Sequence, residues 1–201
     1  MTVLWDVDTQ VDFMLPDGKL YVPGAEQTVP AMQRLVEAAR AAGIVHVASA
    51  DDHELTDAEI ADEPDFRTTY PPHCLRGTRG ARKIPGTEQE DPVPITLELL
   101  PERYLEGREF LILKKNFDVF TNPNTDRLLD RLDPDRVVVF GVATDVCDDA
   151  AIRGFLASGL KVRFVEDAAR GLDEERVAIC TASWREQGVE FTTAEGIARI
   201  F

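Results

Sequence analysis

Short apolar runs separated by helix-like segments dominate the hydrophobic pattern of this 201-residue chain. From Val29 to Ala39 apolar residues recur every three or four positions, which predicts a helix that opens near Thr28 and ends before Gly43. The run Val3 to Val7 is instead apolar at nearly every position, which is typical of a buried strand. We expect further strands at residues 44–50, 110–113, 137–140, 161–165 and 190–192.

Helical segments alternate with these strands in the second half of the chain. We expect helices at residues 125–132, 147–158, 173–187 and 194–200. Buried strands that alternate with helices form parallel sheets covered on both faces. The pattern therefore predicts an α/β protein with three αβα layers, a mostly parallel sheet of about six strands and a single domain over residues 1–201.

A long stretch, from about residue 51 to residue 109, lacks this regularity and is rich in prolines and acids. Irregular regions of this length are uncommon in compact domains and are usually functional. In open α/β sheets the binding site lies beyond the carboxyl ends of the strands. We therefore expect functional side chains in this loop region and directly after each strand.

The charge balance narrows the classes of partner. The chain has 22 Lys and Arg against 37 Asp and Glu, a formal net charge of −15. Such a field repels phosphate backbones and anionic lipids, so we expect neither nucleic acid nor membrane partners and favour a small-molecule substrate. No apolar stretch has the length of a bilayer span.

Cysteine usage and the first residues bear on the compartment. Cys74, Cys147 and Cys180 are an odd number without a CxxC pair, so neither a disulfide framework nor a zinc ribbon is indicated. The start of the chain has no basic segment of a signal peptide. These features favour a reducing, cytoplasmic compartment.

Three residues that could carry chemistry follow three separate strands. Cys147 stands at the start of a predicted helix, where the helix dipole lowers a thiol pKa and free N–H groups can hold an oxyanion. Asp8 ends the first strand and can act as a base toward a thiol. Lys114 ends a buried strand, where an ammonium needs an acidic partner. The alternatives are a packing role for the thiol, a cap for Asp8 and a solvent-reaching ammonium for Lys114.

A second group mixes carboxylates and imidazoles. Asp51 and His53 follow the second predicted strand, and Glu63 and His73 come later in the loop region. Such ligands suit a divalent ion, with zinc favoured and iron or manganese as alternatives. The alternative is that each histidine is a hydrogen-bonded residue without a metal.

In combination these residues resemble the isochorismatase-like cysteine hydrolases, and more narrowly their nicotinamidase branch. The resemblance runs nearly end to end. Residues 8–13 (DTQVDF) are similar to the family pattern D-x-Q-x-D-F, and residues 141–147 (GVATDVC) to its nucleophile turn G-V-A-T-D-x-C. Residues 70–74 (YPPHC) resemble W-P-x-H-C, and residues 114–120 (KKNFDVF) resemble K-x-x-[YF]-S-A-F, with Asp118 and Val119 departing from it.

The resemblance implies an isochorismatase-like hydrolase fold and a role for each matching residue. It implies a triad of Cys147, Asp8 and Lys114, and an oxyanion hole from the N–H groups of Ala143 and Cys147 after a cis Val142–Ala143 peptide. The remaining roles are metal ligation, by Asp51, His53, His73 and Glu63 in place of a third histidine, and aromatic pocket walls, by Phe13, Tyr70 and Phe117.

The activity implied is metal-dependent hydrolysis of an amide through a thioester, with nicotinamide, nicotinate and ammonia as the leading substrate and products. Another small amide, such as a ureido or carbamoyl compound, is the alternative within the class. A non-catalytic binding protein on the same fold is the alternative outside it. Family resemblance also favours a homo-oligomer.

Overall fold

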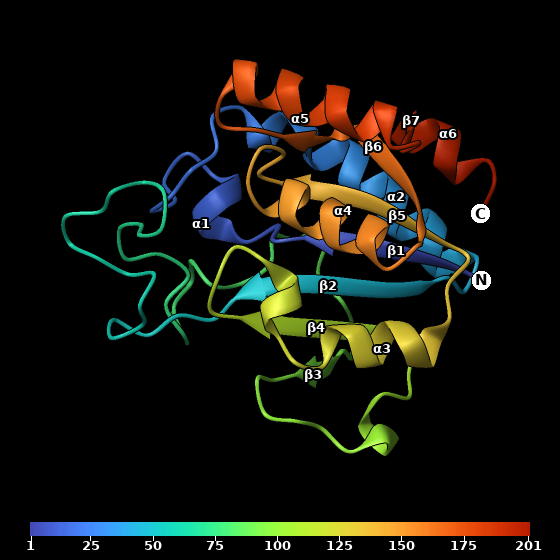
Figure 1. The fold of residues 1–201 in the computed structure, drawn as a ribbon, viewed down its shortest axis with the longest axis horizontal. Helices are drawn as coiled ribbons and strands as arrows, with labels where there is room; N and C mark the ends of the chain where they lie inside the picture. Colours follow the sequence, from blue (N-terminus) through green and yellow to red (C-terminus); the bar gives the residue numbers. More distant parts are fainter.

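A parallel sheet of seven strands forms the middle layer of the structure, a computed structural model that describes residues 1–201 (Figure 1). The strand order is β3-β4-β2-β1-β5-β6-β7, and every neighbouring pair is parallel. The strands are β1 Thr2–Val7, β2 Val45–Asp51, β3 Val93–Ile95, β4 Glu109–Lys114, β5 Arg136–Val142, β6 Lys161–Arg170 and β7 Glu190–Thr192.

Six α-helices cover this sheet. They are α1 Val11–Met14, α2 Val29–Ala41, α3 Thr125–Leu132, α4 Cys147–Ala157, α5 Glu174–Glu186 and α6 Ala194–Ala198. Three short 3₁₀ segments, η1 Ala25–Thr28, η2 Glu102–Tyr104 and η3 Val119–Thr121, lie in the connections. No helix combines the length and the apolar character that a bilayer-spanning segment needs.

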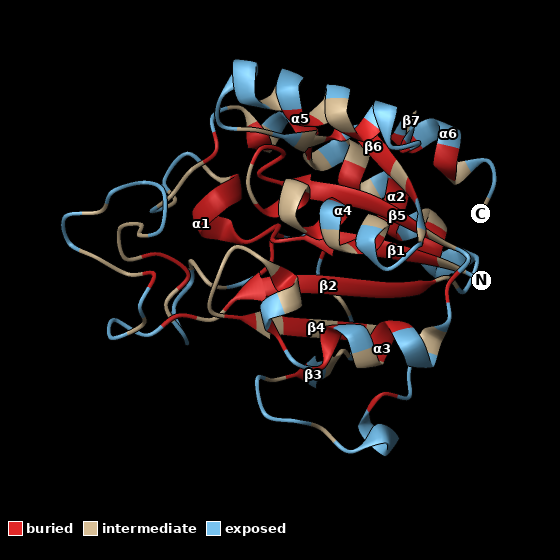
Figure 2. Cartoon of the chain, in the orientation of Figure 1, coloured by how far each residue is buried: buried red, intermediate tan, exposed pale blue.

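Successive side chains of β1 point to opposite faces of the sheet and so divide the core in two. Trp5 belongs to the core under α3, α4 and α5, where its ring meets Phe155 edge-on at a centroid distance of 4.7 Å. Leu4 belongs to the core under α1, α2 and α6 together with Met32. The central strands β1, β2 and β5 are therefore buried on both faces, as Figure 2 shows, and this burial explains their nearly continuous apolar sequences.

The predicted three-layer α/β class is confirmed, but the sheet has seven strands rather than about six. The additional strand, β3, lies inside the long irregular region and is only three residues long. Pro94 at its centre removes a backbone donor, which is compatible only with an edge strand. A strand this short with a central proline carries no recognisable alternation.

The ends of four strands position the functional residues. β2 and β4 pair in a register that sets Asp51 beside Lys114. β1 and β5 pair so that Val7 lies beside Gly141, and a Cβ at position 141 would approach the Val7 carbonyl oxygen to 2.1 Å. Only glycine allows this approach. The loops of residues 52–82 gather at the same end of the sheet, on the left of Figure 1.

Candidate active site

A buried ammonium joins two carboxylates at the carboxyl end of the sheet. Lys114 Nζ lies 2.8 Å from Asp8 Oδ2 and 2.5 Å from Asp51 Oδ1, and all three side chains are buried. Burial disfavours the charged form of Lys114, but the carboxylates of Asp51 and Asp8 outweigh it and hold the pKa of Lys114 well above its ordinary value. Lys114 is therefore a fixed cation between two acids, not a solvent-reaching side chain.

The conformation of Asp8 is set by its neighbours. Its backbone has φ of 50°, which is uncommon for a residue other than glycine. Ser49 Oγ donates a 2.7 Å hydrogen bond to Asp8 Oδ1, while the other carboxylate oxygen faces Lys114. Left-handed residues held in this way cluster at functional sites. Ser49 was not identified from the sequence because it lies within an otherwise apolar strand.

Cys147 begins α4, and its buried thiol lies beside Asp8 and Lys114. Burial raises the pKa of the Cys147 thiol well above its ordinary value; the nearby Lys114 opposes this effect, and the charge and hydrogen bond of Asp8 add to it. The expectation that the helix start lowers this pKa is therefore wrong, because burial outweighs the helix dipole. The proton stays on sulfur, next to a carboxylate that can accept it.

The turn before Cys147 leaves two backbone donors free. The Val142–Ala143 peptide is cis, as the resemblance implies. Neither Ala143 N–H nor Cys147 N–H donates a hydrogen bond to another backbone group. Paired free N–H groups beside a nucleophile are the donors that an oxyanion hole requires.

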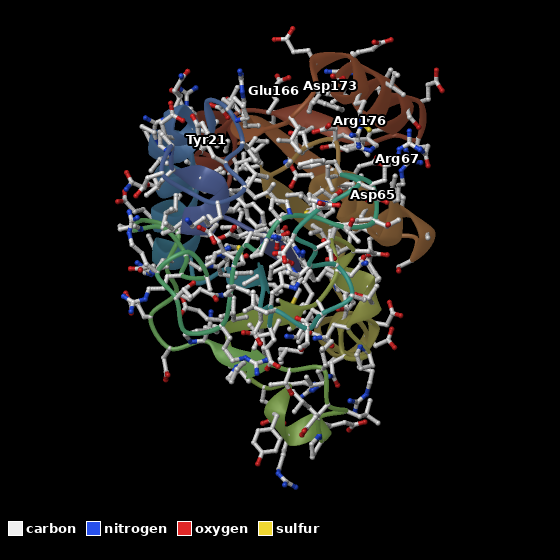
Figure 3. The ribbon with its side chains drawn as sticks, turned by 90° about the vertical axis from the view of Figure 1, so that its left-hand side faces the viewer. Tyr21, Asp65, Arg67, Glu166, Asp173 and Arg176 are labelled. Atoms are coloured by element: carbon white, nitrogen blue, oxygen red, sulfur yellow. The ribbon has the colours of Figure 1, made fainter.

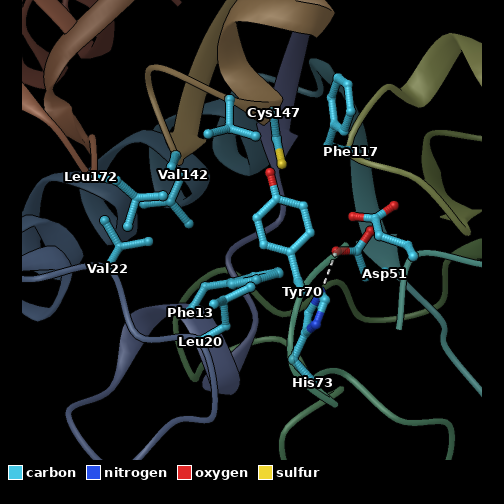
Figure 4. Close-up of a pocket in the computed structure, with 13 residues that line it drawn as sticks. Phe13, Leu20, Val22, Asp51, Tyr70, His73, Phe117, Val142, Cys147 and Leu172 are labelled. Carbon is cyan, nitrogen blue, oxygen red and sulfur yellow. Dashed lines mark ion pairs between the residues drawn. The ribbon is translucent and has the colours of Figure 1, made fainter. Parts of the chain in front are cut away.

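An apolar pocket opens above the thiol (Figure 4). The cavity is narrow, with a volume of about 30 Å³, and most of its lining residues are hydrophobic. The three expected aromatic residues, Phe13, Tyr70 and Phe117, all line it. In Figure 4 the Tyr70 ring stands in the middle of the pocket with its hydroxyl toward Cys147 Sγ.

A compact group of ligand atoms lies at one side of this pocket. Atoms of Asp51, His53 and His73 all lie within 4.8 Å of one another, and the three side chains are buried. His53 Nε2 is 3.8 Å and His73 Nε2 is 3.5 Å from Asp51 Oδ2. The loop region, which separates His53 from His73 by twenty positions in sequence, folds back to bring the two rings together.

The fourth expected residue, Glu63, does not belong to this group. Its side chain is exposed, whereas Glu59 is only 5 % exposed and lines the pocket with Asp51 and His73. Burial and the neighbouring Asp51 carboxylate raise the pKa of Glu59 to about 7. The placement of Glu63 rested on its resemblance to the position of a third histidine in the family pattern, and Glu63 comes four positions after the acid that faces the site.

The donor set fits a divalent ion. Buried polar atoms almost always have partners, yet His53 Nε2 and Glu59 Oε2 are both buried without a hydrogen bond. Two imidazole nitrogens and two carboxylates are ligands that zinc, iron and manganese all accept. Asp51, His53, His73 and Glu59 are thus the residues that would hold such an ion.

The motif at the end of the first strand, residues 8–13, contributes two further residues, which hold the loops in place. Gln10 Nε2 donates to the carbonyl of Asp51 at 2.8 Å, and Gln10 Oε1 accepts from Asp51 N–H at 2.7 Å. Asp12 Oδ2 accepts from the backbone N–H of Cys74 at 2.7 Å. The motif therefore fixes the two chain segments that contain Asp51 and Cys74. The sequence pattern included Gln10 and Asp12 but gave them no role.

Departures from the family pattern fall outside the pocket, apart from Tyr70. Asp118 accepts a hydrogen bond from Phe120 N–H and caps η3, and neither Asp118 nor Val119 lines the pocket. Cys74 and Cys180 are both buried, and Cys180 belongs to the core with Trp184. Neither of them lines the pocket.

Charged side chains rim this end of the molecule (Figure 3). Asp65 accepts hydrogen bonds from the backbone of residues 67–69, and Asp173 accepts one from Arg176 N–H at the start of α5. The Arg176 guanidinium donates to the carbonyl of Asp145, two residues before Cys147. These acids shape turns and a helix cap, and Arg176 supports the nucleophile turn from outside.

Residues 2–196 match the model of the isochorismatase domain family. The chain therefore belongs to the isochorismatase family. Its likeness to nicotinamidases, first seen in the motifs, also appears in comparisons over whole sequences.

Two curated relatives and one solved structure describe that likeness. The nicotinamidase of Escherichia coli (strain K12) is 26 % identical over 183 residues, covering 83 % of this chain and 82 % of the relative. The nicotinamidase/pyrazinamidase of Mycobacterium tuberculosis (strain ATCC 25618 / H37Rv) is 26 % identical over 191 residues, covering 94 % and 97 %. The pyrazinamidase of Pyrococcus horikoshii in complex with zinc superposes with a TM-score of 0.76 at 24 % identity, covering 96 % and 98 %.

Proposed function

We propose that the protein is a metal-dependent amidohydrolase that converts nicotinamide to nicotinate and ammonia. The observation that carries the proposal is the meeting of Cys147, Asp8 and Lys114 beneath an apolar, aromatic-lined pocket. The ligand group of Asp51, His53 and His73 at the pocket's side supports metal dependence, as does the zinc in the archaeal pyrazinamidase of the same fold. Flat aromatic walls suit a heteroaromatic ring.

The proposed reaction begins with a proton transfer inside the triad. Asp8 accepts the proton of Cys147 as Sγ attacks the amide carbon, and Lys114 stabilises the negative charge on both groups. The backbone N–H groups of Ala143 and Cys147 hold the oxyanion, where one such donor is worth roughly 3 kcal/mol.

The second half returns the enzyme to its starting state. Asp8 gives its proton to the leaving nitrogen, the C–N bond breaks, and ammonia departs from a thioester on Cys147. Asp8 then takes a proton from a water molecule that attacks the thioester, and it returns that proton to sulfur as the acid is released. One amide and one water thus yield one acid and one ammonia.

A divalent ion held by Asp51, His53, His73 and Glu59 would supply a Lewis-acidic contact that fixes the substrate through a ring nitrogen or a bound water. Asp51, Glu59 and His73 themselves line one side of the pocket. Phe13 reinforces that side, since its ring lies 5.4 Å from the ring of His73.

A ureido or carbamoyl amide is the second candidate, and Tyr70 is the observation that favours it. Its ring lines the pocket and its hydroxyl points toward Cys147. A polar group at that position suits a substrate with additional donors or acceptors beside the scissile carbonyl.

Ammonia release by the purified protein distinguishes the candidates. We expect turnover of nicotinamide with zinc, manganese or iron supplied in turn, none with Cys147→Ala, and near-normal turnover with Cys180→Ala. Release from ureido or carbamoyl compounds but not from nicotinamide would replace the proposed substrate. No release from any amide would leave the binding-protein alternative.

A further inference from the structure

A carboxylate lies behind one of the metal-site histidines, on the side away from the ligand group. Asp57 Oδ2 is 3.3 Å from His53 Nδ1, while His53 Nε2 faces Asp51 Oδ2 at 3.8 Å. We propose that Asp57 is a positioning residue, which fixes the ring and the tautomer of His53 so that Nε2 is presented to a metal ion. This inference rests on the metal dependence of the proposed function.

The two histidines are held in the same way. His73 Nδ1 lies 2.8 Å from the carbonyl oxygen of Pro71, and His73 Nε2 faces Asp51 Oδ2. A carboxylate and a carbonyl can only accept hydrogen bonds, so a neutral ring that donates from Nδ1 to such a partner keeps the lone pair of Nε2 free for a metal ion. Ligating histidines in metal proteins typically donate their second ring nitrogen to such an acceptor.

Asp57 is itself held in place, which a positioning role requires. Its Oδ2 accepts from Glu54 N–H at 2.8 Å and from Lys115 Nζ at 2.8 Å. The Lys115 side chain is only 25 % exposed and is paired with Asp57. Consecutive lysines at the end of β4 thus serve the two sides of the site: Lys114 holds Asp51, and Lys115 holds the acid behind His53.

Asp57 does not belong to the ligand group itself. Its Oδ2 contacts Nδ1 of His53, whereas Nε2 is the ring nitrogen that faces Asp51 Oδ2. Since Asp57 contacts Nδ1, it acts on an ion only through the imidazole. Its removal would leave the donor atoms in the chain but free the His53 ring to rotate and to exchange tautomers.

Zinc affinity, measured by competition with a chromophoric chelator, tests the inference without relying on activity. We expect Asp57→Ala to weaken zinc binding by at least about tenfold, the range found when outer-shell partners of metal ligands are lost. Asp57→Asn keeps an acceptor oxygen and should lose less. Asp62→Asn, which removes an exposed acid of the same loop without a side-chain contact, is the charge-matched control and should bind zinc as the wild type does.

A second readout separates positioning from folding. The visible spectrum of the cobalt-loaded protein reports ligand geometry, and we expect it to change in Asp57→Ala but not in Asp62→Asn, while the melting temperatures of the metal-free proteins stay close. Equal zinc affinity and equal spectra in the wild type and both Asp57 variants would overturn the inference alone. A wild type that binds no zinc would overturn the metal site and the inference with it, whereas nicotinamide turnover remains a separate measurement.

Discussion

Lys114 and Asp51 form a buried ion pair in which Nζ and Oδ1 are 2.5 Å apart, and the same ammonium lies 2.8 Å from Asp8. Asp51 thus belongs both to the ligand group and to the charge network of the proposed triad. Without the ammonium, two buried carboxylates would share a site with no cation between them. The proposed metal site and proton-transfer site are therefore electrostatically coupled.

Lys114→Met should cost the protein about 3–5 kcal/mol of unfolding free energy, because breaking a buried pair leaves uncompensated charge. Urea denaturation of the metal-free protein measures the loss. Lys115→Met is the matched control and should cost much less, since Lys115 is partly exposed and pairs with one acid. Equal losses in the two variants would contradict the coupling.

Cys147→Ala should abolish amide hydrolysis and leave the fold intact, because no other thiol lies at the pocket. We expect kcat to fall by at least about a thousandfold, as loss of a covalent nucleophile does. Steady-state ammonia release and the melting temperature give the two measurements. A variant that kept about a tenth of the wild-type rate would refute the nucleophile assignment.

Replacing both His53 and His73 by alanine should remove bound metal, because two of the three clustered ligands are lost. Metal content per chain after dialysis, measured by atomic emission, checks this expectation. The third histidine provides the control: His46 lies in β2 away from the group, so His46→Gln should retain the wild-type stoichiometry. Unchanged content in the double variant would place the metal elsewhere.

Glu59→Gln should weaken zinc binding, whereas Glu63→Gln should not, because only Glu59 is buried beside Asp51 and His73. Each variant replaces one carboxyl group of the same loop by an amide, so their difference reflects the position of that group. Chelator competition at neutral pH provides both affinities. The reverse ranking would restore Glu63 as the fourth ligand.

Stability should fall as the medium is acidified, and His46 accounts for a separable part of the fall. Burial, with Lys83 and Arg40 nearby, lowers the pKa of His46 from 6.5 to about 3. Below pH 6.5 the unfolded chain therefore binds a proton that the folded chain rejects until about pH 3. Between pH 8 and pH 5 this linkage amounts to about 2 kcal/mol. Urea denaturation of the wild type and His46→Gln at both pH values should show that difference, and parallel losses in the two proteins would contradict it.

The regular part of the fold could be predicted from the sequence because burial on both faces leaves a strong pattern. The helix Thr125–Leu132 and the strand Glu190–Thr192 have the expected bounds. The strand β6 continues to Arg170, five residues beyond the expected end. Its second half is largely polar, so the sequence did not indicate a strand there, but it pairs with β5. Pairing with the neighbouring strand sets the length of such a segment, and the local sequence does not reveal that pairing.

The candidate site shows the same contrast between residues next to regular elements, which could be predicted, and residues in loops, which could not. Asp8, Asp51, Lys114 and Cys147 stand next to strands or at a helix start, so topology predicts their meeting. Glu59 and Asp57 lie in a loop without periodicity, and their positions depend on how residues 54–73 fold back over the sheet. The thiol pKa was misjudged for a related reason: the helix start is visible in the sequence, but the depth of burial is not.

The parallel register of β4 against β2 has a consequence for how this site can change. Lys114 and Lys115 are adjacent, and one turns toward Asp8 and Asp51 while the other reaches Asp57. A deletion of one residue within β4 would shift every later side chain to the opposite face of the sheet. Lys115 would then take the place of Lys114, and Lys114 the place of Leu113, while Asp57 would lose its ammonium. An alignment that tolerates a gap in this strand would therefore keep the letters Lys-Lys although one of the two ion pairs is gone.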